Sequence, residues 1–394
     1  MQALEGIKVL DLSRTLAGPF STMMLGDMGA DIIKVEQPGK GDETRSFTPP
    51  SWNGESCYYL TSNRNKRSIT VDLKTSEGKE IIYKLAEQAD IVVENFRTGT
   101  ADELGYGYEQ LKEINPRLIY CSISGFGRTG SESYRAGYDL LLQGFSGLMS
   151  ITGEAEGSPL KVGTSIVDLT TGMYAAFAIV TALMARERTG KGQYLDVSLL
   201  DGQIALLNYH ATNFFATGNF AKRYGSGHPT IVPYQAFQAK DMDIILAVAN
   251  NRLWVKCCEA FGWNDLLEDA RFKTNEERVV YRTELVDIMN DRLSAMESKE
   301  IFDLMNIAGV PCGPIHTVEQ ILTHPIVEER EMILEIDHPT INNLKVPAFP
   351  VKFSETPATV RRHPPLLGEH TNEILLEIGY SEEQIQLMKE HSVL

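Results

Sequence analysis

The first 200 residues alternate short β-branched runs with amphipathic segments, and this alternation restricts the fold more than any other feature of the chain. It is typical of a parallel sheet covered by helices on both faces. Helices are expected over residues 19–28 and 76–88. Strands are expected over residues 7–12, 31–36, 68–73, 90–94, 118–123 and 193–197. We therefore predict an α/β large domain with at least five parallel strands.

The pattern changes near Gly225. Two further strands, residues 231–237 and 244–248, are followed by expected helices over 252–261 and 275–296. We predict a large domain over residues 1–224, a smaller α+β domain over 225–330 and a C-terminal segment over 331–394. The final helix should begin after Ser381, because Gln384 completes a capping box.

Composition limits the possible partners and the cellular compartment. The net charge of −16 argues against broad binding to nucleic acid or to an anionic membrane, so an anionic ligand needs a local cluster of Lys and Arg. The five cysteines are scattered and lack CxxC spacing, which indicates reduced thiols and a cytoplasmic protein. No targeting segment is visible. The longest apolar run, after Gly172, has roughly 14 residues, fewer than a bilayer span needs.

Asp168 stands at the head of that apolar segment. It follows a small, apolar lead-in and precedes a run of Ala, Ile, Leu and Met, so we expect it at the N-cap of a buried helix. The simplest interpretation of such an Asp is a helix cap. The functional alternative is a carboxylate held at a ligand site.

Other motifs exclude common kinds of site. All eight histidines lie at or after His210, so residues 1–209 hold neither a Ser-His-Asp triad nor a His-rich metal site, and we predict no metal. Residues 125–130 fit GxGxxG after a strand. The residues that follow are poor helix formers, however, and no acid ends a strand about 20 residues on. We therefore predict that this loop shapes a cleft and binds no dinucleotide.

Two segments carry polar side chains to the carboxyl ends of predicted strands, where open α/β sheets bind ligands. They are residues 71–74, with Lys74, and residues 94–99, with Asn95, Phe96 and Arg97. Each alone is more often a strand-to-helix turn. Together they bring two cations, an amide and an aromatic ring to one sheet edge.

These residues, with others along the chain, resemble class III coenzyme A transferases of the CaiB/BaiF type, and the dicarboxylate and oxalate branch most closely. The resemblance covers nearly the whole chain and is carried by residues 16–19, 29–36, 41–45, 63–68, 94–97, 136–139, the Asp168 segment, 189–193, 309–314 and 366–371. It implies a Rossmann-like large domain built from both chain ends, a small domain between them, and an interlocked homodimer.

The resemblance also implies roles for residues. Asp168 is the expected nucleophile. The expected substrates are acyl-CoA and a small carboxylic acid, with a dicarboxylate favoured, and no permanently bound cofactor is expected. The residues expected to bind CoA are Leu16, Ala17, Val71, Lys74, Asn95, Phe96, Arg97, Tyr138 and Asp139. Where some family members hold Gln, Arg and Arg at positions that contact CoA, this chain has Leu16, Gln37 and Glu103.

A carboxylate beside a thioester can form a mixed anhydride and then an aspartyl-CoA thioester, which is the chemistry expected for Asp168. A distal substrate carboxylate needs cations or N–H donors. Candidates are Arg45, Arg64, Asn250 and Asn251, although an Arg in such a place more often forms a surface or interdomain salt bridge. Two alternatives stay open. One is an α-methylacyl-CoA racemase, which carries His where this chain has Tyr138; the other is a non-catalytic CoA-binding subunit of a heteromeric transferase.

Overall fold

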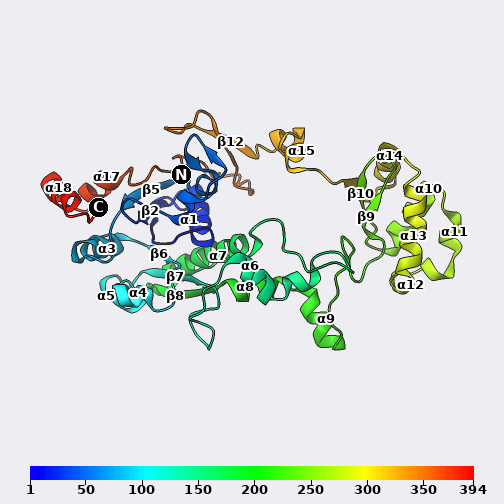
Figure 1. Cartoon of the computed structure of the whole chain (residues 1–394), viewed down its shortest axis with the longest axis horizontal. Helices are drawn as coiled ribbons and strands as arrows, with labels where there is room; N and C mark the ends of the chain where they lie inside the picture. Colours follow the sequence, from blue (N-terminus) through cyan, green and yellow to red (C-terminus); the bar gives the residue numbers. More distant parts are fainter. The chain divides into compact units, whose positions relative to one another are not determined.

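A computed structural model describes all 394 residues, and the chain forms two compact units (Figure 1). Unit 1 comprises residues 1–146, 162–209 and 326–394, and unit 2 comprises residues 147–161 and 210–325. The chain therefore enters unit 2 twice. The domain boundaries expected at residues 224/225 and 330/331 stay a prediction, because compact units do not show which parts of the chain fold independently.

Unit 1 is built on a six-stranded sheet in which every neighbouring pair is parallel. Its order is β5-β2-β1-β6-β7-β8. Numbered along the sheet's own strands this is 3-2-1-4-5-6, the order of the Rossmann fold. The strands are β1 (Lys8–Asp11), β2 (Asp31–Glu36), β5 (Lys66–Thr70), β6 (Ile91–Glu94), β7 (Ile119–Ser124) and β8 (Gln193–Ser198). The expected α/β sheet is confirmed, with six parallel strands.

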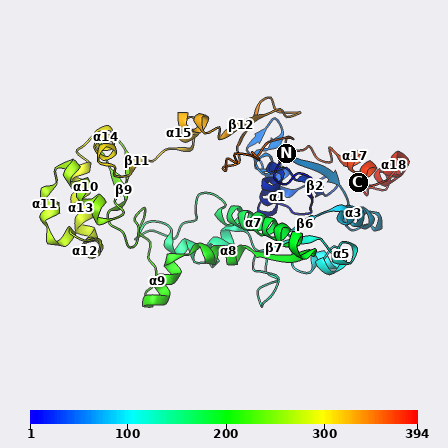
Figure 2. The ribbon, with the colours of Figure 1, turned by 180° about the vertical axis from the view of Figure 1, so that it is seen from behind.

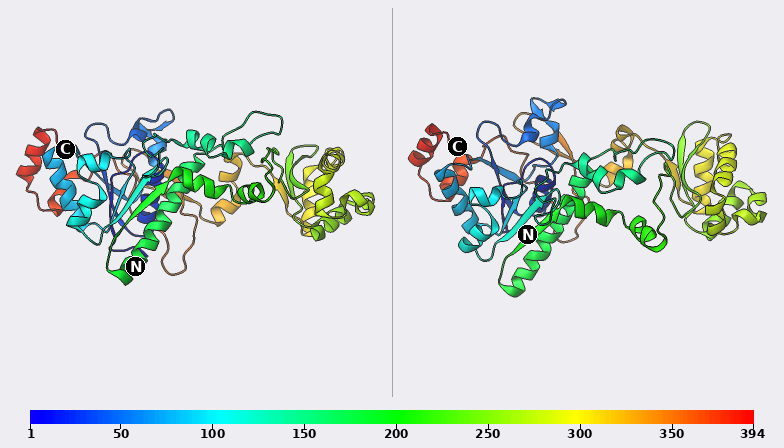
Figure 3. Two further views of the ribbon diagram at one scale, coloured as in Figure 1. Left: turned by 90° about the horizontal axis from the view of Figure 1, so that it is seen from below. Right: turned by 60° about the horizontal axis from the view of Figure 1, so that its bottom comes forward.

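Helices cover both faces of this sheet (Figures 2 and 3). Side chains alternate along a strand, so Leu10 of β1 enters the core on one face and Val9 the core on the other. The first core packs against α3 (Ser76–Gln88), α4 (Thr100–Leu104), α5 (Tyr108–Ile114), α17 (Thr371–Glu377) and α18 (Glu382–Glu390). The second packs against α1 (Ala17–Asp27), α6 (Asp139–Phe145), α7 (Ile166–Thr189) and α8 (Leu199–Leu206). The capping box at Ser381 and Gln384 is present.

The helix α7 has 24 residues, so it is longer than the apolar run of roughly 14 residues that was identified in the sequence. By length and composition α7 could cross a membrane, but the core helix of a soluble protein meets the same criteria. One face of α7 is buried in the second core, through residues such as Ala175 and Ile179. A Cβ on Gly172 would lie 2.7 Å from the carbonyl oxygen of Ala17, so glycine permits the close packing of α7 on α1.

The remaining elements of unit 1 are short. Residues 37–65 contain β3 (Ser51–Trp52), β4 (Glu55–Ser56), α2 (Cys57–Leu60) and a 3-10 turn (Glu43–Ser46). Others are α16 (Pro325–Glu329), β12 (Ile333–Ile336), β13 (Leu344–Pro347), and α9 (Tyr209–Thr217), which leads into unit 2.

Unit 2 has a three-stranded antiparallel sheet of order β11-β10-β9 and its own core around Trp254. The expected single helix over 275–296 is two helices, because Tyr281 leaves the helical conformation between them. The strands are β9 (Tyr234–Gln238), β10 (Asp243–Ala247) and β11 (Cys312–Pro314). The helices are α10 (Asn251–Phe261), α11 (Asn264–Glu268), α12 (Asn275–Val280), α13 (Arg282–Leu293), α14 (Ser298–Ala308) and α15 (Val318–Leu322), with 3-10 turns at Leu148–Ile151 and Ala270–Phe272.

Candidate active site

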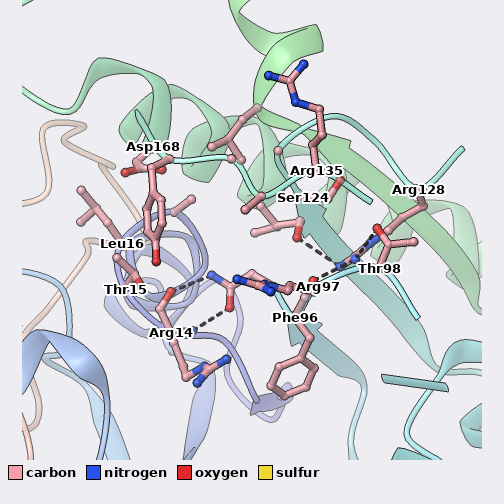
Figure 4. Close-up of a pocket in the computed structure, with 18 of the residues that line it drawn as sticks. Arg14, Thr15, Leu16, Phe96, Arg97, Thr98, Ser124, Arg128, Arg135 and Asp168 are labelled. Atoms are coloured by element: carbon pink, nitrogen blue, oxygen red, sulfur yellow. Dashed lines mark hydrogen bonds between the residues drawn. The ribbon is translucent and has the colours of Figure 1, made fainter. Parts of the chain in front are cut away.

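A cavity of about 310 Å³ lies at the carboxyl ends of β1, β6 and β7 in unit 1 (Figure 4). The strand order reverses between β1 and β6, and open α/β sheets bind ligands at such a switch point. The cavity is lined by Arg14, Thr15, Leu16, Ala17, Glu43, Asn95, Phe96, Arg97, Thr98, Ile123, Ser124, Gly125, Arg128, Ser133, Arg135, Ala136, Gly137, Tyr138, Asp168 and Leu199.

The cavity brings together most of the residues predicted from the sequence. Those that line it are Leu16, Ala17, Asn95, Phe96, Arg97, Tyr138 and Asp168. Val71 and Lys74 follow β5, which is not a neighbour of β6 in the sheet, and they do not line the cavity. Val71 is buried in the core, whereas Lys74 is exposed. Gln37 and Glu103, which replace family arginines, are also exposed and outside the cavity.

Asp168 is the third residue of α7, and the N-cap is Ser165. The prediction of an N-cap Asp was wrong because α7 begins at Ile166, two residues before it. The carboxylate that serves the helix end is Asp139, which was predicted to bind CoA but is not among the residues that line the cavity: its Oδ1 accepts the backbone N–H of Val167 at 2.8 Å. Gln143 Nε2 donates to the other Asp139 oxygen at 2.6 Å. Both Asp139 oxygens thus accept hydrogen bonds, one from the start of α7 and one from within α6.

Asp168 is half-buried, and no protein group donates a hydrogen bond to its carboxylate. Burial, and then the negative charge of Asp139, raise the pKa of Asp168 to about 7. A helix dipole and free N–H donors would favour the ionised form, but the Val167 N–H at this helix end donates to Asp139. Near neutral pH, Asp168 therefore exchanges between a protonated form and a basic carboxylate.

Tyr138, at the N-cap of α6, lines the cavity together with Asp168. No histidine is among the lining residues, so no imidazole is available there as a second base. This is the position at which the racemase alternative requires His. Tyr58 was not predicted to belong to the site. Burial raises the pKa of its phenol, and the negative charges of Asp168 and Asp139 raise it further, so Tyr58 lies close enough to Asp168 to interact with it electrostatically.

Four arginines line the cavity, and they differ in how far they are free to bind a ligand. Arg128 is committed, because its guanidinium contacts both oxygens of the buried Glu94, at 2.9 and 3.1 Å, and the Phe96 carbonyl at 2.9 Å. Arg97 is exposed and forms no ion pair, and Arg14 only approaches Glu43 at 3.6 Å. Arg135 pairs with Glu132 at 2.7 Å, so Arg97 and Arg14 are the cations available to an anionic ligand.

Arg14, Arg128 and Arg135 were not predicted. Arg14 follows β1 just as Asn95 follows β6, so the rule that identified the β6 end could have found it. Arg128 belongs to the Gly-rich loop, which the sequence predicted to shape a cleft. Gly125 of that loop lines the cavity and packs against Gly137, since a Cβ on Gly125 would lie 2.8 Å from the Gly137 Cα.

The structure does not bring the two arginines proposed for the substrate into this cavity. Arg45 forms a bidentate pair with Glu36, with both N···O distances 2.7 Å. Arg64 pairs with Asp27 at 2.6 Å, and both side chains are buried. Each guanidinium is therefore satisfied inside unit 1.

The two predicted asparagines belong to unit 2. Asn250 is the N-cap of α10, and its Oδ1 accepts the Leu253 N–H at 2.9 Å. The Oδ1 of Asn251 accepts a hydrogen bond at 2.9 Å from Arg278, whose side chain is fully buried. Both side chains thus hold the start of α10.

Known proteins share this architecture over nearly the whole chain. The family model "CoA-transferase family III" matches residues 4–371. The chain is 44% identical to succinyl-CoA:glutarate CoA-transferase of Homo sapiens, over 96% of this chain and 86% of that protein. It is 39% identical to acetyl-CoA:oxalate CoA-transferase of Acetobacter aceti, over 89% of each.

A solved structure gives the same result. The crystal structure of a CaiB/BaiF family protein from Brucella suis matches with a TM-score of 0.85 and 40% identity, covering 96% of this chain and 99% of that one. The resemblance inferred from the sequence is confirmed, and the ligand implied is a CoA thioester that enters as a substrate. The chain belongs to CoA-transferase family III.

Proposed function

We propose that this enzyme transfers CoA from a short acyl-CoA, of the succinyl-CoA or acetyl-CoA type, to a small dicarboxylate, with Asp168 as the nucleophile. The observation that carries the proposal is the state of Asp168: a half-buried carboxylate with a pKa of about 7 and no hydrogen-bond donor, in a cavity that also contains Arg14 and Arg97. The names of the relatives support dicarboxylate substrates, since they include glutarate, mesaconate and oxalate transferases.

The reaction consists of four acyl transfers. An Asp168 oxygen attacks the thioester carbonyl, the C–S bond breaks, and a mixed anhydride and a CoA thiolate form. The thiolate then attacks the Asp168 carbonyl, which gives an aspartyl-CoA thioester and releases the first carboxylate. An acceptor carboxylate attacks this thioester to form a second anhydride. The expelled thiolate attacks the acceptor carbonyl of that anhydride, which yields the new acyl-CoA and restores the Asp168 carboxylate with no net proton or redox change.

Trapping tests the nucleophile. Enzyme incubated with succinyl-CoA and then hydroxylamine should carry a hydroxamate on the peptide that contains Asp168, because hydroxylamine cleaves both the anhydride and the thioester. Enzyme incubated with free CoA is the control and should carry none. Absence of the adduct, or near wild-type turnover by Asp168→Ala, contradicts the mechanism.

A substrate panel tests the acceptor class separately. Succinyl-CoA and acetyl-CoA serve as donors, and mono- and dicarboxylic acids of two to six carbons serve as acceptors. Short dicarboxylates should give the highest kcat/KM. If carnitine, a bile acid or an aromatic lactate outcompetes every dicarboxylate, the acceptor assignment fails while the transferase assignment stands.

We further propose that the enzyme is a homodimer of interlocked subunits, as the resemblance implies. In support, α7 exposes a row of large apolar side chains opposite its core face, and α6 exposes others. They are Met173, Tyr174, Phe177 and Met184 of α7 and Leu140, Leu141 and Phe145 of α6. Apolar surfaces of this size on a soluble chain usually mark an interface. Mixed tagged and untagged enzyme should form no heterodimer within hours under native conditions, and rapid exchange would refute the interlock.

A further inference from the structure

The loop between β1 and α1, residues 12–16, holds an unusual backbone conformation at the edge of the cavity. Thr15 has φ of +73°, a region that β-branched residues rarely adopt. Both neighbours of Thr15, Arg14 and Leu16, line the cavity. Such a conformation persists only where the surroundings hold it in place.

Asn95, at the end of β6, holds the loop at Arg14. Its Oδ1 accepts the backbone N–H of Arg14 at 2.8 Å, and its Nδ2 donates to the Arg14 carbonyl at 2.7 Å. The dashed lines beside Arg14 in Figure 4 mark these bonds. Both polar groups of the Asn95 side chain are therefore used by one residue of the neighbouring loop.

Asp42 holds the next residue. Its carboxylate accepts the backbone N–H of Thr15 at 3.2 Å and pairs with Lys34 at 2.8 Å, with both charged side chains fully buried. Lys34 also donates to the Ser13 carbonyl at 3.0 Å. The loop is thus fixed on both sides of Arg14 by side chains from other elements.

We propose that Asn95 is a positioning residue, which acts on the CoA substrate through the backbone of Arg14. This inference rests on the proposed function. Its physical basis is geometry: Oδ1 and Nδ2 of Asn95 bond both backbone polar groups of Arg14, at 2.8 and 2.7 Å, and so fix the orientation of that peptide segment on the end of β6. Asn95 thereby sets the direction in which the Arg14 guanidinium leaves the loop.

A double-mutant cycle separates positioning from contact. The four proteins are wild type, Asn95→Ala, Arg14→Ala and the double variant, and the measured quantity is the dissociation constant for CoA by titration calorimetry. If Asn95 acts through Arg14, Asn95→Ala weakens CoA binding about tenfold in wild type but less than about threefold once the Arg14 side chain is absent. A ratio of the two effects of three or more supports the proposal. A smaller ratio, including the case in which Asn95→Ala has no effect at all, overturns it.

Two controls accompany the cycle. Asn115→Ala removes a similar amide, which donates to the Ala86 and Ala89 carbonyls away from the cavity, and it should leave CoA binding unchanged. If Asn95→Ala does not fold, Asn95→Ser takes its place, because a serine cannot reach both backbone groups of Arg14. Binding is measured without turnover, so wild-type enzyme that binds CoA but transfers none refutes the proposed function and leaves this cycle interpretable.

Discussion

Neutralising Asp139 should move the acidic limb of the pH–rate profile to lower pH. Asp168, the proposed nucleophile, can attack only when ionised, so kcat/KM should rise with pH and level off above the pKa of about 7. The negative charge of Asp139 is one of the two causes that raise this pKa. Asp139→Asn removes the charge but keeps an oxygen for the Val167 N–H. The pKa of Asp168 then falls, and the ionised form persists at lower pH.

The two causes bound the size of the effect. The pKa of Asp168 is raised from 3.8 to about 7, a difference of about 3 units, and burial contributes more than Asp139 does. Asp139 therefore accounts for less than half of it, and we expect a shift of roughly 1 unit on neutralisation, or about 1.4 kcal/mol. At pH 6 the ionised fraction would rise from about one tenth to about one half, so kcat/KM at that pH should rise about fivefold relative to its plateau.

The assay compares kcat/KM for succinyl-CoA at about pH 6 and pH 8.5 within each protein. The amide that Asp139→Asn introduces has one oxygen, so it loses the hydrogen bond from Gln143 Nε2. If this loss lowers activity equally at both pH values, it cancels in the ratio of the two kcat/KM values. Glu87→Gln, on the exposed face of α3, removes one negative charge outside the cavity and should leave the limb in place. If the midpoint pH of the acidic limb in Asp139→Asn stays within about 0.3 units of the wild-type value, the charge of Asp139 does not raise the pKa of Asp168.

Three further predictions concern stability and assembly. Asp168→Asn should raise the free energy of unfolding at pH 8 by about 1–2 kcal/mol, because an ionised carboxyl with a raised pKa destabilises the fold above that pKa. Urea titrations should show that this gain in stability vanishes below about pH 4, and a gain that is the same at every pH would contradict the prediction. Lys34→Met should cost about 3–5 kcal/mol in the same titration because it leaves Asp42 buried and unpaired, and the additional change Asp42→Leu should recover part of the loss. Phe177→Asp should yield monomers in sedimentation experiments, whereas an unaltered dimer would exclude the α7 face from the interface.

The fold was largely predictable because its signals are local. The strand–helix alternation predicted the parallel sheet, and β2 and α3 have the expected bounds. The start of α7 was missed because its N–H partner, Asp139, lies 28 residues before Val167 in the chain. The sequence immediately around Asp168 does not contain that partner.

The site was predictable only in part, because strand order decides which strand ends meet. Asn95 and Lys74 both follow strands, but β6 lies beside β1 at the switch point and β5 lies at the edge of the sheet. Lys74 is therefore outside the cavity that Asn95 lines. The pairing of Arg64 with Asp27, 37 residues apart, likewise depends on tertiary structure.

The sheet has the strand order of a dinucleotide-binding fold but lacks that fold's phosphate loop. In dinucleotide folds the loop after the first strand is Gly-rich, and its helix N-terminus meets the pyrophosphate. Here the corresponding N–H groups of Arg14 and Thr15 are taken by Asn95 and Asp42. The GxGxxG sequence instead follows β7, where Arg128 fills the loop. The side-chain cations Arg14 and Arg97, which line the cavity at the switch point, are the groups that we propose for binding an anionic substrate on this sheet.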